Sequence, residues 1–145
     1  MPLPILVQVA RTFDASAERV FDAWLDPDLV GRWMFVPALG DETVPRIAID
    51  ARAGGRFSFL VLRGGEEIDH VGEYIALERP HRLAFTWGVA AIVDGDSRVT
   101  IDITRRGSGC ALELTYELRP EWAEYADRTR DGWTDMLGCL AAALD

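Results

Sequence analysis

The segment from Glu121 to Leu144 constrains the fold of this chain more than any other feature. Its apolar residues recur at steps of three and four, which is the spacing of one face of an α-helix. They are Trp122, Tyr125, Ala126, Trp133, Met136, Leu137, Leu140, Ala141 and Leu144. Such a face needs an apolar partner surface, and the residues before it offer one only if they form a sheet. A single helix rarely fills the concave side of a sheet, so we expect space for a ligand between the two.

The preceding residues predict an almost uninterrupted antiparallel sheet, because apolar and polar residues alternate with a period of two. A first strand carries Val7, Val9 and Phe13 on one face, and Arg11 interrupts this apolar row. The remaining strands are expected at 46–51, 56–62, 67–77, 82–89, 98–105 and 110–118. Glycine-rich turns separate most of them, which favours hairpins and a meander. The alternation is unclear within 67–77, which indicates a β-bulge.

Two short helices are expected between the first strand and this meander. The first covers 17–25, with Ser16 as its N-cap. The second begins with Asp26 as N-cap and Pro27 at the first helical position, and it carries the apolar residues 29, 30, 33 and 34 before Pro37. The stretch 36–45 holds a glycine, two prolines and two acids, so it predicts an exposed loop.

Size and composition narrow the classes of function. The 145 residues suit a single domain over 1–145 with one core. A net charge of -9 and a pI near 4.7 argue against nucleic acid and anionic membranes as partners. All 15 basic residues are arginine, which excludes lysine Schiff-base chemistry and a P-loop lysine. No segment approaches the ~20 apolar residues of a membrane span, so no membrane insertion is expected.

The cysteines and the first residues predict a cytoplasmic location. Cys110 and Cys139 lie far apart in the sequence and are expected to be buried, reduced thiols rather than a disulfide. The stretch 1–7 has no basic leader and no cleavage site, so it does not predict a signal peptide.

Five blocks of the sequence, in this order along the chain, resemble one known family. They are Phe21–Trp24 continuing through Asp26–Pro27 to Trp33, Gly54–Phe57, Gly72–Tyr74, Pro80–Trp87, and Gly132–Trp133 followed by Leu137 and Leu140. Together they resemble the activator of heat-shock-protein-90 ATPase homologue family. This family lies within the START-like superfamily, which includes polyketide cyclases and the major birch-pollen allergen. The resemblance covers essentially the whole chain.

The resemblance implies an α+β helix-grip fold. In that fold a curved antiparallel sheet of about seven strands carries two short helices after its first strand and a long C-terminal helix across it. Superfamily members enclose a cavity between sheet and helix, where they bind lipids, steroids or polyketides, and some catalyse reactions on them. The eukaryotic namesakes stimulate a chaperone ATPase but carry an additional domain.

Three positions depart from the family pattern near the implied cavity. Met34 follows Trp33 where relatives usually have another aromatic residue. Cys110 and Tyr116 stand where relatives commonly have Thr and His. The identity of the ligand therefore does not carry over from the family.

No motif demands catalysis, a metal or a cofactor. His70 and His81 do not have the spacing of metal ligands to any other suitable residue. The serine within 107–109 lacks the G-x-S-x-G spacing of a nucleophile elbow. The glycine pairs 54–55 and 64–65 precede no helix that would bind phosphate. We interpret all three glycine-rich stretches as turns and expect no cofactor.

The candidate ligand-binding residues are those expected to converge beneath the terminal helix. Buried Tyr and Trp carry polar atoms that orient ligands in apolar cavities. His70 points into the cavity in one strand phase and to solvent in the other. Arg11 would anchor a ligand carboxylate or phenolate if it faces inward, and an edge position in water is the alternative. Gly132 costs the helix ~1 kcal/mol relative to Ala, which indicates a bend or a close approach there. The full set is Arg11, Trp33, Phe35, Phe57, Phe59, His70, Tyr74, Phe85, Trp87, Tyr116, Trp133, Met136 and Leu137.

We therefore expect non-catalytic binding of a small hydrophobic or aromatic ligand, such as a lipid, sterol or polyketide-like molecule. The second helix and the loop 36–45 would form the entrance. A cyclase or dehydratase is the first alternative and would need an acid/base pair near the substrate. That pair would come from His70, Glu73, Tyr74, Tyr116 and Asp135. A co-chaperone-like interaction module or a homodimer, acting through the surface, is the second alternative.

Overall fold

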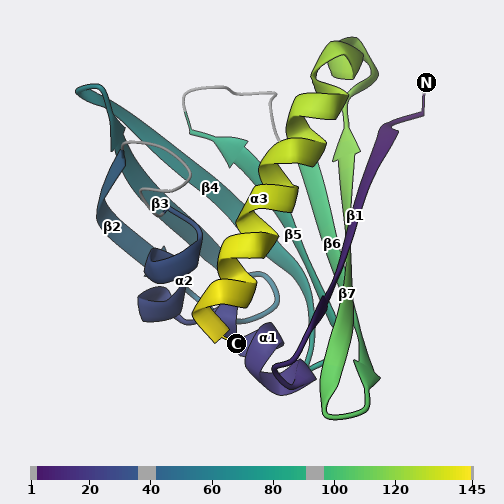
Figure 1. The fold of residues 1–145 in the computed structure, drawn as a ribbon. Helices are drawn as coiled ribbons and strands as arrows, with labels where there is room; N and C mark the ends of the chain where they lie inside the picture. Colours follow the sequence, from purple (N-terminus) through teal and green to yellow (C-terminus); the bar gives the residue numbers. More distant parts are fainter. Residues whose placement is uncertain (1–2, 36–41, 91–96, 145) are drawn as a thin grey trace.

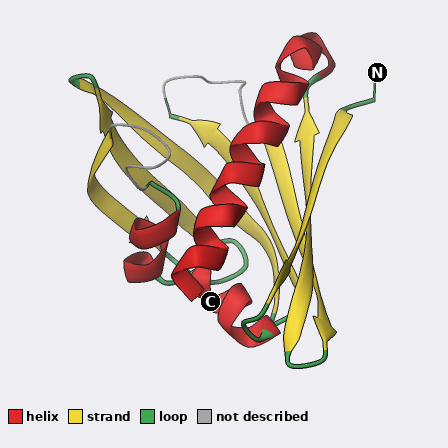
Figure 2. Cartoon of the chain, in the orientation of Figure 1, coloured by secondary structure: helices red, strands yellow, loops and turns green. Residues whose placement is uncertain are grey.

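The computed structural model describes residues 3–35, 42–90 and 97–144, which form a curved sheet with helices on its concave side (Figure 1). The long helix α3 runs diagonally across that side, and α1 and α2 lie near its C-terminal end (Figure 2). The elements are β1 (Ile5–Phe13), α1 (Ala17–Ala23), α2 (Pro27–Trp33), β2 (Glu42–Ile49), β3 (Arg56–Arg63), β4 (Glu66–Glu78), β5 (Arg82–Val89), β6 (Ser97–Arg106), β7 (Gly109–Leu118), the 3₁₀ segment η2 (Pro120–Tyr125) and α3 (Ala126–Leu144).

The seven strands follow the order β1-β7-β6-β5-β4-β3-β2, and every neighbouring pair is antiparallel. Strands β2 to β7 form a meander, and β1 pairs with β7, so that the first and last strands are neighbours. This is the α+β helix-grip arrangement, and the predicted fold class is confirmed. None of the helices within the described ranges is long and apolar enough to cross a membrane.

The predicted loop 36–45 is wrong in its second half. Strand β2 begins at Glu42, whereas 36–41 and the predicted turn at 94–95 lie outside the described residues. Pro45 fits because β2 is an edge strand whose register with β3 shifts between Thr43 and Arg46. An edge strand with a bulge does not require the backbone N–H that proline lacks.

The predicted terminal helix also begins later than expected. Residues 120–125 form the 3₁₀ segment, and Trp122 there has non-helical angles (φ -107°, ψ 22°). The Arg119 guanidinium lies over the Trp122 ring at 5.4 Å, and Tyr125 is exposed. The buried stripe of the helix consists of Trp133, Leu137, Leu140, Ala141 and Leu144. Trp122 and Tyr125 therefore do not belong to the face that packs on the sheet.

The predicted bulge in the fourth strand is confirmed. The pairing of β4 with β5 steps from Tyr74–Phe85 to Ala76–Ala84, so β4 holds one extra residue there. Ile75 at this position is exposed, while Tyr74 is buried. The bulge therefore keeps the apolar side chains of the strand on the concave face on both sides of it.

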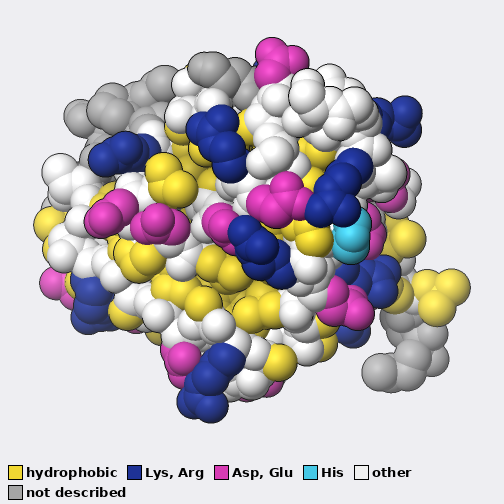
Figure 3. Space-filling view, turned by 90° about the horizontal axis from the view of Figure 1, so that it is seen from below, with side chains coloured by type: hydrophobic (Ala, Val, Ile, Leu, Met, Phe, Trp, Pro, Cys, Tyr) yellow, Lys and Arg dark blue, Asp and Glu magenta, His cyan; other side chains and the backbone are white. Residues whose placement is uncertain are grey.

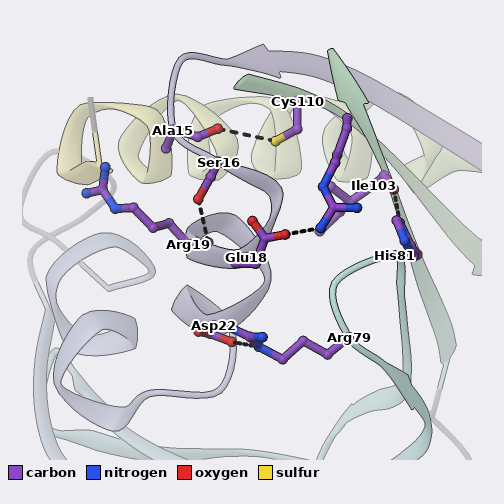
Figure 4. A network of polar contacts seen from close by, with 10 residues as sticks. Ala15, Ser16, Glu18, Arg19, Asp22, Arg79, His81, Ile103 and Cys110 are labelled. Atoms are coloured by element: carbon purple, nitrogen blue, oxygen red, sulfur yellow. Dashed lines mark hydrogen bonds and ion pairs between the residues drawn. The ribbon is translucent and has the colours of Figure 1, made fainter. Parts of the chain in front are cut away.

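Helix α1 ties the end of α3 to the sheet (Figure 4). The Ser16 hydroxyl accepts a hydrogen bond from the Arg19 backbone N–H at 3.2 Å, which caps α1 as predicted. The Arg19 guanidinium donates to the Leu144 carbonyl at 3.0 Å and so satisfies a carbonyl in the last turn of α3. The Cys110 thiol donates to the Ala15 carbonyl at 3.6 Å.

Two ion pairs join α1 to the ends of strands on the same side. Arg79 binds both carboxylate oxygens of Asp22 at 2.8 Å, and Arg105 pairs with Glu18. The hydrogen bond from Arg79 holds the pKa of the Asp22 carboxyl below its usual range. Because these side chains are half exposed, the pairs orient α1 more than they stabilise the fold.

Gly72 and Gly132 both lie in the sequence blocks that resemble the family, but Gly72 is closely packed and Gly132 faces open space. A Cβ on Gly72 would lie 1.9 Å from the Thr86 carbonyl oxygen and 2.5 Å from the Phe57 ring, which packs over the glycine. A Cβ on Gly132 in α3 would meet nothing within 4 Å. The close approach expected at Gly132 is therefore wrong, and α3 runs through this position as a continuous helix.

We predict that alanine substitutions at these two glycines change stability in opposite directions. Gly72→Ala should lower the free energy of unfolding by about 2 kcal/mol or more, because Thr86 and Phe57 must move. Gly132→Ala should raise it by about 1 kcal/mol through helix propensity alone. Denaturant unfolding of both variants and the parent protein measures the two effects. Equal effects of the two substitutions would contradict the packing described around Gly72.

Candidate functional site

A cleft of about 310 Å³ lies between α3 and the sheet. Helix α3 supplies one wall, strands β3, β4 and β5 supply another, and the residues that follow α2 close one side. The lining residues are Met34, Phe35, Arg63, His70, Trp87, Gly132, Asp135 and Met136. The cleft is therefore where the sequence predicts a ligand, under the terminal helix.

Three stacked rings form the most regular part of this lining. The His70 ring lies 5.5 Å from the Phe35 ring and 5.2 Å from the Trp87 ring, with interplanar angles of 28° and 17°. Strand β4 turns His70 inward because it shares a phase with Gly72 and Tyr74, which are both buried. Of the two orientations open to His70 from the sequence, the structure has the inward one.

Deeper under the helix, aromatic side chains fill most of the space. Phe57 stacks on Phe59 at 4.8 Å, and Trp87 meets Trp133 edge-on at 5.6 Å. A void of about 10 Å³ remains among them. Its lining residues are Trp24, Met34, Phe57, Phe59, Tyr74, Leu83, Phe85 and Trp87. Met34 and Trp87 thus border both the cleft and the void.

Trp24 Nε1 and Ser97 Oγ are buried polar atoms without a hydrogen-bond partner within the described residues, and of these two residues only Trp24 borders the void. The neighbouring Trp33 differs, because its Nε1 donates to the Ala23 carbonyl at 3.0 Å. A buried polar atom without a partner costs about 1–3 kcal/mol. The Trp24 N–H is therefore a candidate for a contact with a ligand.

Burial raises the pKa of two tyrosines on the concave face. Desolvation raises the pKa of Tyr116, and the nearby Ser97 hydroxyl opposes this rise without forming a hydrogen bond of normal geometry. Desolvation also raises the pKa of Tyr74, and the Asp50 carboxylate adds to the rise. Both phenols stay protonated at neutral pH.

The structure divides the predicted ligand-binding residues into three groups. Phe35, His70, Trp87 and Met136 line the cleft. Phe57, Phe59, Tyr74 and Phe85 line the void. Trp33 and Leu137 are fully buried in the core and border neither space, while Tyr116 packs against Trp133 at 6.2 Å beneath α3.

Arg11 lies outside both spaces. Its side chain is exposed at the edge strand β1, where its Nη1 atom would be 3.9 Å from a Cβ on Gly138 of α3. An inward guanidinium that anchors a ligand is therefore wrong, and the edge position in water is the one observed. An edge strand leaves such a long side chain free to reach solvent.

Six lining residues were not among the predicted ligand contacts: Trp24, Met34, Arg63, Leu83, Gly132 and Asp135. Trp24 belongs to the apolar stripe of the first predicted helix and so suggested only core packing. Met34 stood out as a departure from the family pattern beside the cavity. Cys110, a departure from the family pattern on β7, contacts Ala15 and borders neither space. Neither Cys110 nor Cys139 forms a disulfide.

Larger hollows on the outer face of the sheet make weaker candidates. One of about 610 Å³ runs over β2, β3 and β4, and one of about 550 Å³ lies over β1, β5, β6 and β7. Small and charged side chains dominate both, and Ser58 and Arg46 bind Asp69 beside the first. Ligand sites are more often enclosed by apolar walls, which favours the cleft under α3.

The surface and the metal-type residues add no further site among the described residues. Large apolar side chains that are exposed occur singly, at Leu3, Leu6, Ile75 and Tyr125. Seen from below, acidic and arginine side chains cross the apolar part of the surface (Figure 3). No group of three or more His, Cys, Asp and Glu side chains in the described ranges could hold a metal ion.

Comparisons with known proteins agree with this fold. The profile of the family described as "Activator of Hsp90 ATPase homolog 1-like protein" matches residues 14–145. No curated protein matches the chain. Among solved structures, protein CV1439 from Chromobacterium violaceum is similar, with a TM-score of 0.83, 26% identity, and coverage of 97% of this chain and 98% of that chain.

Two further structures are similar in fold. The AHSA1-like protein from Aeromonas hydrophila has a TM-score of 0.79 at 22% identity and covers 96% of this chain and 91% of its own. CalU16 from Micromonospora echinospora has a TM-score of 0.70 at 24% identity and covers 97% of this chain and 76% of its own.

We predict that the buried tyrosines make the protein lose stability at alkaline pH. The pKa of Tyr116 is raised in the folded state, so its neutral form contributes to the stability of the fold. This contribution is complete below about pH 10, the ordinary tyrosine pKa, and is lost as pH rises through the raised pKa. The chain has no lysine, so few other groups titrate in this window. Tyr116→Phe should lose less stability between about pH 9 and pH 11 than the parent protein does.

Denaturant midpoints at the two pH values measure this difference. Tyr125→Phe is the matched control, because Tyr125 is exposed and its removal should leave the pH dependence unchanged. Equal losses in the parent protein and in Tyr116→Phe would contradict the buried environment of Tyr116.

Proposed function

Since the chain belongs to the family of Activator of Hsp90 ATPase homolog 1-like proteins, we propose that it binds a small aromatic or hydrophobic ligand in the cleft under α3, without catalysis. Members of this START-like group commonly bind hydrophobic ligands in the same part of the fold. The proposal assigns the ligand to the space between Met34, His70, Trp87 and Met136.

The stacked rings of Phe35, His70 and Trp87 are the observation that carries this proposal. Aromatic faces and edges in a concave site favour flat ligands, because offset stacking adds about 0.5–1.5 kcal/mol per ring pair to area burial. The volume of about 310 Å³ lies at the low end for small-molecule sites. A compact aromatic molecule therefore suits the cleft better than a long-chain lipid.

Charged residues at the cleft restrict how such a ligand lies. Arg63 and Asp135 are lining residues that are exposed, and they come from opposite walls, strand β3 and helix α3. A ligand's polar groups would point toward this side, and its apolar rings would lie against Trp87 and Met136. The proposed ligand is thus amphipathic rather than a pure hydrocarbon.

A cyclase or dehydratase is the second candidate, because His70 and Asp135 line the same cleft. The other residues considered for an acid/base pair support it less: Glu73 is exposed, and Tyr74 and Tyr116 lie outside the cleft lining. An enzyme would lose turnover in His70→Ala while still binding an aromatic probe. A binding protein would show no turnover to lose.

We predict that a naphthalene probe binds the cleft and that filling the cleft prevents it. Titration of 2-ethylnaphthalene should change the tryptophan emission through Trp87 and raise the thermal midpoint. Gly132→Leu should weaken binding at least about tenfold, because its side chain enters the cleft where an added Cβ now meets open space.

Ala142→Leu is the matched control. It adds a similar side chain at an exposed position of the same helix, outside the cleft lining, so probe binding should match that of the parent protein. If the parent protein shows no change in emission or thermal midpoint, or if Gly132→Leu binds the probe as well as the parent does, the cleft is not the binding site.

A further inference from the structure

We propose that the void behind Met34 is a subsite for a ligand oxygen, with Trp24 Nε1 as its hydrogen-bond donor. This inference rests on the proposed ligand binding in the cleft and goes further by naming the ligand class. The class is an aromatic molecule that carries a neutral carbonyl or hydroxyl oxygen at its inner end.

The donor is identified by comparing two adjacent indoles. Trp24 is only 3% exposed, and its Nε1 has no partner within the described residues. The Trp33 ring, 4.7 Å away and inclined by 73°, offers that N–H at most a weak contact with its π-electrons. Trp33 itself is satisfied by the Ala23 carbonyl. Trp24, which borders the void, therefore keeps an unused donor.

The size of the void selects the group that binds there. A space of about 10 Å³ holds roughly one water-sized group, so a single oxygen fits and a ring does not. A buried water needs two to four polar partners, whereas the lining is almost entirely aromatic and aliphatic. A carbonyl oxygen needs one donor, and its carbon skeleton suits the apolar walls.

The charge of the bound oxygen follows from the same lining. No arginine among the described residues borders the void, and a carboxylate placed among these rings would be desolvated without a counterion. The subsite therefore fits a ketone, quinone or phenol and not an ionised acid.

Met34 and Trp87 separate the void from the cleft, since both border each space. Methionine is unbranched and flexible, and Met34 lies at the C-cap of α2. A shift of its side chain would join the two spaces. The ligand ring then stays in the cleft beside Trp87 while its oxygen reaches Trp24.

The test compares two probes of similar shape on the full chain by calorimetry: 2-acetylnaphthalene, which has a carbonyl oxygen, and 2-ethylnaphthalene, which does not. The ethyl compound is the more hydrophobic, so the informative quantity is the ratio of the two dissociation constants. Since Trp24→Phe lacks the donor, we expect its dissociation constant for the acetyl probe to rise about tenfold relative to that for the ethyl probe.

Trp33→Phe is the matched control, because it also removes a buried indole N–H. Trp33 borders neither space, so this variant should lower the thermal midpoint but leave the ratio unchanged. A second measurement does not depend on either substitution. In an ¹⁵N–¹H spectrum of the parent protein, the acetyl probe should shift the indole N–H signal of Trp24 downfield, and the ethyl probe should not.

The outcomes separate this inference from the proposed function. A ratio that shifts in Trp24→Phe but not in Trp33→Phe, with the signal shift, supports the subsite. Binding of both probes with an unchanged ratio and no probe-specific signal shift overturns the subsite and leaves the proposed function standing. Binding of neither probe overturns both.

Discussion

Trp133 of α3 fixes how far the long helix stands from the sheet, and the remaining spaces depend on this distance. Its ring packs against Trp24 at the C-cap of α1 at 6.2 Å, Trp87 of β5 at 5.6 Å and Tyr116 of β7 at 6.2 Å. Beyond it toward the C-terminus the helix lies on the core, with Leu137 and Leu140 fully buried. On the side of Gly132 and Met136 the contact is incomplete, and the cleft occupies that position. One bulky residue at the crossing point thus determines both the tight part of the interface and the open part.

The fold was largely predictable because its signals are local. Alternation of apolar residues, the Ser16 cap and the glycine turns each act within a few residues, and together they define the order of the elements. The errors occurred where tertiary contacts decide. Pro45 can lie in a strand because β2 is an edge strand with a shifted register. Trp122 lies outside the apolar stripe of the helix, and the Arg119 guanidinium covers its ring. Neither arrangement follows from a residue and its immediate neighbours alone.

The site was predictable as a region but not as a set of contacts. The phase of β3 and β5 placed Phe57 and Trp87 on the concave face correctly, since period-two alternation assigns faces. For His70 the sequence left both faces open, and only the structure shows the inward orientation. Whether a residue on that face lines a cleft, a void or a filled core depends on the volumes of its neighbours. Arg11 shares the phase of buried residues yet lies in solvent at an edge, and Trp24 looked like ordinary packing until its N–H proved to have no partner within the described residues.

The pairing of β1 with β7 has a consequence for how the chain acquires its structure during synthesis. Ile5 pairs with Leu118, so β1 has no strand to join until β7 has left the ribosome. The hairpins from β2 to β6 join neighbouring segments and can form earlier. During that interval β6 is an unprotected edge with an apolar face that α3 does not yet cover. The final strand and helix therefore complete the fold and also end the period in which the nascent chain is most prone to aggregate.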